Sequence, residues 1–174
     1  MSLNTQIIGK TMPHGFAGTY ARQPDMIVNT RPVGGTESIP FGTALKYDNG
    51  NVIVMGGTGT TAAQFAGIAG SEVKSALVYP DQNGGKYAPG EACSVFQRGS
   101  INVLCQRGTP ALGGDVYVRI AKTADYATAL VGGFEAEADD KAAENSVKLT
   151  NCQWGGAADA NSVAELVILT RANA

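Results

Sequence analysis

Residues 87–120, YAPGEACSVFQRGSINVLCQRGTPALGGDVYVRI, contain three short apolar runs separated at close intervals by turn-forming residues. The runs cover residues 93–96, 101–105 and 116–120, with glycine, proline, serine and aspartate between them. Short apolar runs with such punctuation are typical of consecutive antiparallel strands. The segment therefore predicts a β-meander, and none of its turns carries a nucleophile beside a base.

The triplet Arg98, Gly99 and Ser100 predicts the first turn of this meander. A hairpin centred on Gly99 would place Cys93 opposite Cys105, although a slip of one residue in the loop would change the register and turn the side chains to the other face. The two cysteines would then form either a cross-strand disulfide or a pair of small buried side chains, as free cysteines often are. We favour the buried free thiols.

The composition agrees with a β-rich fold. Charged residues make up 16% of the 174-residue chain, and glycine occupies 23 positions, so the surface is sparsely charged and turns are frequent. A chain of this length can bury a core as one domain without a metal or a disulfide. We predict a mainly β fold, a single β-barrel or β-sandwich domain with an extended N-terminal arm and little helix.

The charge of the chain argues against nucleic acid as a partner. The formal net charge is -2, and the arginines are scattered along the sequence, so no basic patch is available for phosphates. No apolar run has membrane-spanning length, and the first residues lack the apolar centre of a secretory signal, so we expect no membrane and synthesis in the cytosol. The three cysteines fit neither a disulfide framework nor a zinc site, and we expect them to be reduced.

Residues 1–42 differ from the rest of the chain. Proline and glycine recur there too often for a helix or a central strand. Apolar side chains such as Ile7, Phe16, Tyr20 and Met26 are nevertheless more numerous than a disordered leader would carry. We predict an extended N-terminal arm over residues 1–42, lying on its own domain or on a neighbouring chain, and a β-barrel or β-sandwich domain over residues 43–174.

Three patterns in the domain give more local predictions. The pair Asn49 and Gly50 favours a two-residue hairpin that puts Leu45 and Tyr47 opposite Val54 and Val52. Residues 135–144 are rich in alanine and acids but lack an apolar stripe, which indicates a solvated excursion or one exposed helical turn. Residues 163–169 are apolar on most of both faces, which predicts an inner strand.

Candidate catalytic and metal-binding patterns are weak. The glycine-rich residues 56–61 lack the lysine and the following helix of a phosphate-binding loop. The single histidine, His14, lies between Pro13 and Gly15, a poor place to hold a general base, so we expect a packing or surface role. The acids around Asp139 and Asp140 lack the order of a calcium-binding loop. We predict no catalytic residue, no cofactor and no metal.

Four aromatic side chains are compatible with a sugar-binding function. Trp154, Tyr79, Tyr87 and Tyr117 could line a groove for sugars, although a lone tryptophan before two glycines more often covers a core. A carbohydrate-binding or adhesive β module is therefore our alternative function.

Four segments together carry a resemblance. They are the arm TMPHGFAGTYARQPDMIVNTRPVGG, the following PFGTALKYDNG, the run TAAQFAGIAGSEVKSA and the block YAPGEACSVFQRGSINVLCQRGTPALGGDVYVRI. In this order and spacing they resemble the structural cement, or capsid decoration, proteins of tailed bacteriophages. The similarity covers most of the chain, and no single segment would establish it.

The resemblance implies a non-enzymatic virion structural protein. It would bind the outer surface of the mature capsid and cement neighbouring subunits of the major capsid protein, as a homotrimer or, in some relatives, a dimer. The protein would be made in the host bacterial cytoplasm and end on the capsid surface. Interfaces often depend on aromatic and arginine side chains, so we expect the capsid or intersubunit contacts to come from five arm residues: Phe16, Tyr20, Arg22, Met26 and Arg31.

Overall fold

The computed structural model describes residues 13–72, 84–123 and 126–171, and strands dominate these ranges. Helix is confined there to single turns such as η1 (Ala62–Gln64) and η3 (Ala143–Asn145). None of the described helical segments is long and apolar enough to cross a membrane. The strands are β1 (Ile27–Pro32), β2 (Ile39–Pro40), β3 (Ala44–Asp48), β4 (Asn51–Val54), β5 (Phe65–Ala69), β6 (Lys86–Tyr87), β7 (Ala92–Leu104), β8 (Asp115–Arg119), β9 (Phe134–Glu135), β10 (Ser146–Trp154) and β11 (Val163–Ile168).

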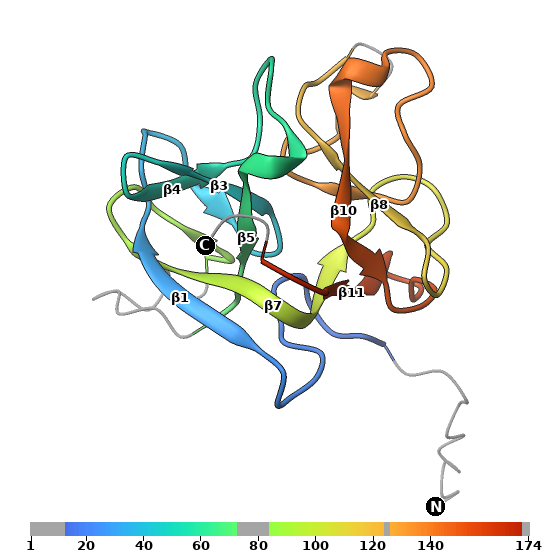
Figure 1. Cartoon of the computed structure of the whole chain (residues 1–174), viewed down its shortest axis with the longest axis horizontal. Coiled ribbons are helices and arrows are strands. Elements are labelled where there is room, and N and C mark those ends of the chain that lie inside the picture. Colours follow the sequence, from blue (N-terminus) through green and yellow to red (C-terminus); the bar gives the residue numbers. More distant parts are fainter. Residues whose placement is uncertain (1–12, 73–83, 124–125, 172–174) are drawn as a thin grey trace, which may run out of the picture.

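Nine strands form one antiparallel sheet in the order β4-β3-β5-β7-β11-β10-β8-β9, with β1 added to β7, and β2 pairs separately with β6. Figure 1 shows β1, β3, β4 and β5 on one side of the molecule and β8, β10 and β11 on the other, with β7 running through both. An isolated bridge joins Val33 to Val52, and another joins Cys105 to Phe134. Each half of the sheet therefore curls back on itself. The predicted mainly β fold with little helix is confirmed.

The strand β7 is continuous where the sequence predicts a turn. Its first part pairs with β1 and β5, and its second part, from Gly99 to Leu104, pairs with β11. Gly99 has φ 102°, and a Cβ atom there would lie 2.5 Å from the carbonyl oxygen of Asp25. The predicted hairpin at Gly99 is wrong, because this glycine permits a close backbone approach inside a strand rather than a reversal of the chain.

Because β7 continues through Gly99, Cys93 and Cys105 do not lie opposite each other as they would in a hairpin. Cys93, Cys105 and Cys152 are free and buried. Cys93 belongs to one core cluster and Cys105 to the other. Burial raises the pKa of Cys93 to about 12, which keeps its thiol protonated. The interpretation as buried free thiols is confirmed.

The core has two clusters that meet at β7. Cys93 and Val95 belong to the smaller cluster, which also takes side chains from β3, β4 and β5. Phe96, Ile101 and Val103 belong to the larger cluster, which surrounds Trp154 and takes side chains from β8, β10 and β11 as well as from β3 and β5. Full burial of each large apolar side chain contributes roughly 1.5–3 kcal/mol. Both halves therefore depend on side chains from the same strand.

Two local predictions are confirmed. In the β3–β4 hairpin, Leu45 lies opposite Val54 and Tyr47 opposite Val52, with Asn49 and Gly50 at positive φ in the turn. This is the register that the Asn-Gly turn favours. The strand β11 is buried on nearly its whole length, as expected of an inner strand between β7 and β10.

Part of the expected arm is built into the sheet. Residues 27–32 form β1 on β7, and Val33 and Ile39 are buried in the smaller core cluster. Residues 1–12 lie outside the described ranges. The division of the chain at residue 42 stays a prediction.

We expect Gly99→Ala to lower the free energy of unfolding by about 2–4 kcal/mol, because the new methyl group meets the Asp25 carbonyl and the backbone is held at positive φ. The matched control is Gly90→Ala. Gly90 has φ 80°, but a Cβ atom at this position would have nothing within 4 Å, so only the backbone cost of about 1 kcal/mol applies. Urea unfolding of both variants measures the difference, and equal losses would contradict the close approach at Gly99.

Candidate functional site

Residues 14–22, which we call the strap, run along the second part of β7. Gly18 N donates to Asn102 O at 2.7 Å, Asn102 N donates to Thr19 O at 2.8 Å, and Ala21 N donates to Ser100 O at 3.0 Å. Tyr20 forms an isolated antiparallel bridge with Ile101. The strap thus adds a short, strand-like segment to the edge of β7 that β11 does not occupy.

Tyr20 anchors the strap to the body through both ends of its side chain. Its ring lies 5.2 Å from the ring of Phe96, measured between centroids. Its hydroxyl donates to the Glu72 carboxylate at 2.5 Å. Burial and this hydrogen bond raise the pKa of Tyr20. Both ends of the Tyr20 side chain are therefore bound within the protein.

Arg22 ends the strap with a two-point ion pair. Its Nε lies 2.6 Å from Glu165 Oε1 and its Nη2 lies 2.9 Å from Glu165 Oε2. The Arg22 side chain is 72% exposed, while that of Glu165, on β11, is 9% exposed. The guanidinium lowers the pKa of Glu165. Planar bidentate pairs of this kind fix geometry more firmly than single contacts.

His14 begins the strap and contacts the segment between β10 and β11. Its backbone N donates to Asp159 Oδ2 at 2.8 Å, and its ring Nε2 lies 3.2 Å from the Ala157 carbonyl oxygen. Asn102 Nδ2 donates to the His14 carbonyl at 2.7 Å. These contacts agree with the expected packing role of His14.

The five predicted contact residues fall into different environments. Phe16 is 81% exposed at a turn of the strap, and Arg31 is exposed on β1. Met26 is partly buried against the larger core cluster. Phe16, Tyr20 and Arg22 share the strap, whereas Met26 lies directly before β1 and Arg31 lies within it. Phe16, Arg22 and Arg31 are thus the exposed members, although Arg22 is already paired with Glu165. The contact role of all five residues stays a prediction.

Leu112 is an exposed apolar residue that the sequence did not single out. It is 81% exposed, as much as Phe16, in the turn where Gly113 N donates to the Trp154 carbonyl. A leucine next to Gly113 and Gly114 is a signal that could have indicated an apolar turn tip.

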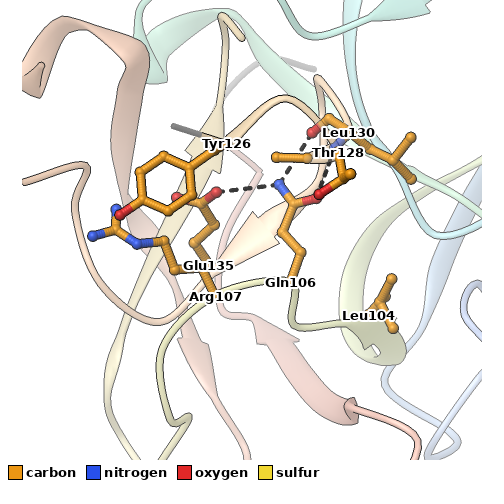
Figure 2. Close-up of a pocket in the computed structure, with 8 residues that line it drawn as sticks. Leu104, Gln106, Arg107, Tyr126, Thr128, Leu130 and Glu135 are labelled. Carbon is orange, nitrogen blue, oxygen red and sulfur yellow. Dashed lines mark hydrogen bonds between the residues drawn. The ribbon is translucent and has the colours of Figure 1, made fainter. Parts of the chain in front are cut away.

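A pocket of about 260 Å³ opens between the end of β7 and residues 126–130 (Figure 2). The Gln106 amide bridges to both backbone groups of Leu130 there, accepting at 2.9 Å and donating at 3.1 Å. Tyr126 donates its hydroxyl to Asp140 at 3.0 Å. These polar groups are already bonded inside the protein, while Leu104 and Leu130 are 38% and 45% exposed. The pocket mouth therefore offers mainly apolar contact.

Beneath this pocket lies a fully buried ion-pair cluster. Arg119 Nε lies 2.5 Å from Glu135 Oε1, and Arg119 Nη1 lies 2.9 Å from Asp139 Oδ2, with all three side chains 0% exposed. The Tyr126 ring covers the cluster, 5.0 Å from the Arg119 guanidinium carbon. The predicted solvated loop is wrong for Glu135 and Asp139, because the pairing of β9 with β8 places Glu135 beside Arg119 and the chain after β9 brings Asp139 to the same guanidinium. It is confirmed for Glu137 and Asp140, which are exposed, and η3 matches the expected exposed turn.

Hydrogen bonds from the backbone and from Arg119 explain the lowered pKa of Asp139. Burial alone would raise the pKa of this carboxyl, but the backbone N–H of Lys141 and the Arg119 guanidinium lower it to about 2. Within the described ranges, no group of three or more His, Cys, Asp or Glu side chains could hold a metal ion. The acids around Asp139 thus serve an internal ion pair.

Of the aromatic residues considered for sugar binding, the three that lie in the described ranges do not form an exposed platform. Trp154 and Tyr87 are 0% and 1% exposed. Tyr117 is partly buried on β8, and Tyr79 lies outside the described residues. Stacking of sugars on Trp154 is therefore contradicted by its burial.

Comparisons with known proteins point to one family. The family described as "Structural cement protein (E217 gp24/Pam3 gp6)" matches residues 3–169 of the chain. The fold is similar to a chain in the structure titled "The capsid of Myoviridae Phage XM1", with a TM-score of 0.64, 18% sequence identity and 98% of each chain covered. No curated protein matches the sequence significantly.

We expect Arg119→Met to lower the free energy of unfolding by about 3–5 kcal/mol, because it leaves two buried carboxylates without a cation. Lys148→Met is the matched control. It removes a lysine whose pair with Asp115 is about half exposed on both sides, and it should change stability little. Denaturant unfolding compares the two, and a small loss for Arg119→Met would show that the cluster tolerates removal of its cation.

The lowered pKa of Asp139 predicts an acid-dependent contribution to stability. A carboxyl whose folded pKa lies below its unfolded value stabilises the protein above about pH 4 and loses that contribution as the pH falls toward its folded value of about 2. The stability gap between the wild type and Asp139→Asn should therefore narrow over this interval. Urea unfolding across the interval measures the gap, and a constant gap would contradict the assignment.

Proposed function

The chain belongs to the structural cement protein family, and from this premise we propose that it binds the outer surface of a phage capsid and cements neighbouring major capsid protein subunits. The match over residues 3–169 is the observation that carries this proposal. Family membership indicates a structural role in the virion and association with capsid proteins. The fold likeness to a chain of a phage capsid structure adds support at the level of architecture.

Cementing follows from mass action. A protein that binds the assembled shell but not its separate subunits stabilises the shell by its own binding free energy, and many copies multiply the effect. A body with two curled halves fixed on one strand suits this role, because a rigid ligand loses little conformational freedom on binding. We infer a homotrimer, with a dimer as the alternative, synthesis in the host cytoplasm, and no bond-making chemistry.

The contact surface is proposed to include two exposed members of the predicted set. Phe16 presents an aromatic ring that is 81% exposed on a strap fixed at several points to the body. Arg31 is exposed on β1. Aromatic and arginine side chains dominate binding energy at many interfaces when they become buried. Tyr20, Met26 and Arg22 would act in this proposal by holding the strap and β1 in place.

A direct test is cosedimentation of the purified protein with expanded capsids that lack it. Saturation at a fixed ratio to the major capsid protein supports the cement role. Absence of binding to expanded shells, even with the protein in large excess over the major capsid protein, would overturn it.

Phe16→Ala should weaken capsid binding by about tenfold or more, because truncation of a central aromatic contact commonly costs above 1 kcal/mol. Leu112→Ala is the matched control, since Leu112 is equally exposed but lies outside the strap. Both variants should retain the wild-type unfolding midpoint. Binding isotherms on expanded capsids decide the question, and unchanged affinity of Phe16→Ala would remove Phe16 from the contact.

A further inference from the structure

The strap is held at both ends by carboxylates of the body. At its start, Asp159 Oδ2 accepts from the His14 backbone N at 2.8 Å. At its end, Glu165 accepts from Arg22 at 2.6 and 2.9 Å. These acids come from the segment after β10 and from β11, so the two contacts fasten the strap across the strand edge.

Apolar burial contributes little to the strap between these ends. Of residues 14–22, only Gly18 is buried, and Phe16 and Arg22 are exposed. Tyr20 provides the main packing contact, through its ring against Phe96. Segments with few buried apolar contacts open at lower free energy than the core they lie on. The strap is therefore a separate unit of low stability on a more stable body.

Few charged groups surround the two acids. Glu165 faces Arg22 and His14 from the strap, and Ser100 from β7 donates to it. Asp159 faces His14 and accepts from the backbone N–H groups of Asn161 and Val163. Arg22 lowers the pKa of Glu165, and the His14 N–H lowers the pKa of Asp159. In the middle of the strap, Glu72 faces Tyr20 and the hydroxyl of Ser94.

We propose that the strap is an acid-released latch, which detaches from the body when Asp159 and Glu165 become protonated while the two halves of the sheet stay folded. Protonation neutralises Glu165 opposite the Arg22 guanidinium and weakens Asp159 as an acceptor for the His14 N–H. The strap then retains neutral hydrogen bonds, from its backbone to β7 and Ser71 and from the Asn102 amide, together with the His14 ring contact and the Tyr20 contacts.

Acid weakens the closed strap, because the pKa values of Asp159 and Glu165 are lowered in the folded protein. Carboxyls with lowered folded pKa values stabilise the closed strap above about pH 4 and lose this contribution as the pH falls below that value. The strap has fewer buried apolar contacts than the body. Loss of the two carboxylate contributions is therefore expected to open the strap at a pH where the body stays folded.

Hydrogen exchange of the isolated wild-type protein tests this order. After correction for intrinsic rates, protection of the Gly18 and Ala21 amides should fall by about tenfold or more between about pH 7 and pH 3. The fluorescence of Trp154, the single tryptophan and 0% exposed, should stay that of the folded body. Unchanged protection of Gly18 and Ala21, or their loss together with the Trp154 signal, would overturn the proposal.

A second experiment is done at neutral pH and removes the negative charges of Glu165 and Asp159 by mutation. Trypsin must take the Arg22 side chain into its binding pocket to cleave after it, and in the closed strap that side chain is paired with Glu165. Glu165→Gln, and the double variant with Asp159→Asn, should be cut after Arg22 at least about tenfold faster than the wild type. Asp115→Asn is the matched control, since it neutralises an exposed acid paired with Lys148 away from the strap. Equal cleavage rates in all proteins would overturn the proposal.

The latch goes beyond the proposed cement function and is tested without capsids. If Phe16 on the strap contacts the capsid, release of the strap would also weaken capsid binding in acid. Failure of capsid binding with a working latch would refute the cement role alone, and the reverse result would refute the latch alone.

Discussion

Continuity of β7 is the constraint on which the rest of the structure depends. This strand pairs with β1 and β5 before Gly99 and with β11 after it, and it supplies side chains to both core clusters. The close approach of the Asp25 carbonyl to Gly99 leaves no room for a side chain at that point. The two curled halves are therefore joined through one backbone, and a change at Gly99 alters the packing of both.

The sequence was sufficient for features that local chemistry decides. Asn49 and Gly50 require a turn with positive φ, so the register of Leu45 and Val54 follows from two residues. Gly99 was misread for a related reason, since a glycine between two apolar runs is compatible with either a turn or a close approach within one strand. Only the position of residues 25 and 26, which are distant in sequence, distinguishes a turn at Gly99 from a close backbone approach within the strand.

For the candidate site, the sequence predicted which residues matter but not where their side chains lie. Phe16, Tyr20 and Arg22 are predicted as contact residues because aromatic and arginine side chains often carry the binding energy of interfaces. Their directions were not predictable, because Tyr20 meets Phe96 and Arg22 meets Glu165 only in the folded chain. The buried acids were missed for the same reason: an acid that is solvated and one that pairs with Arg119 look alike in sequence.

Apolar contacts and polar contacts divide the molecule into parts with different stability. The two clusters around β7 consist of buried apolar side chains, and the buried Arg119 is neutralised by two acids at short distance. The strap, by contrast, is held mostly by hydrogen bonds and by an ion pair with one partner in solvent, contacts whose net contribution in water is small. In the proposed cement role this division would be useful, because the body would keep its shape on every copy while the strap, if it contacts the capsid, would adjust without loss of the core.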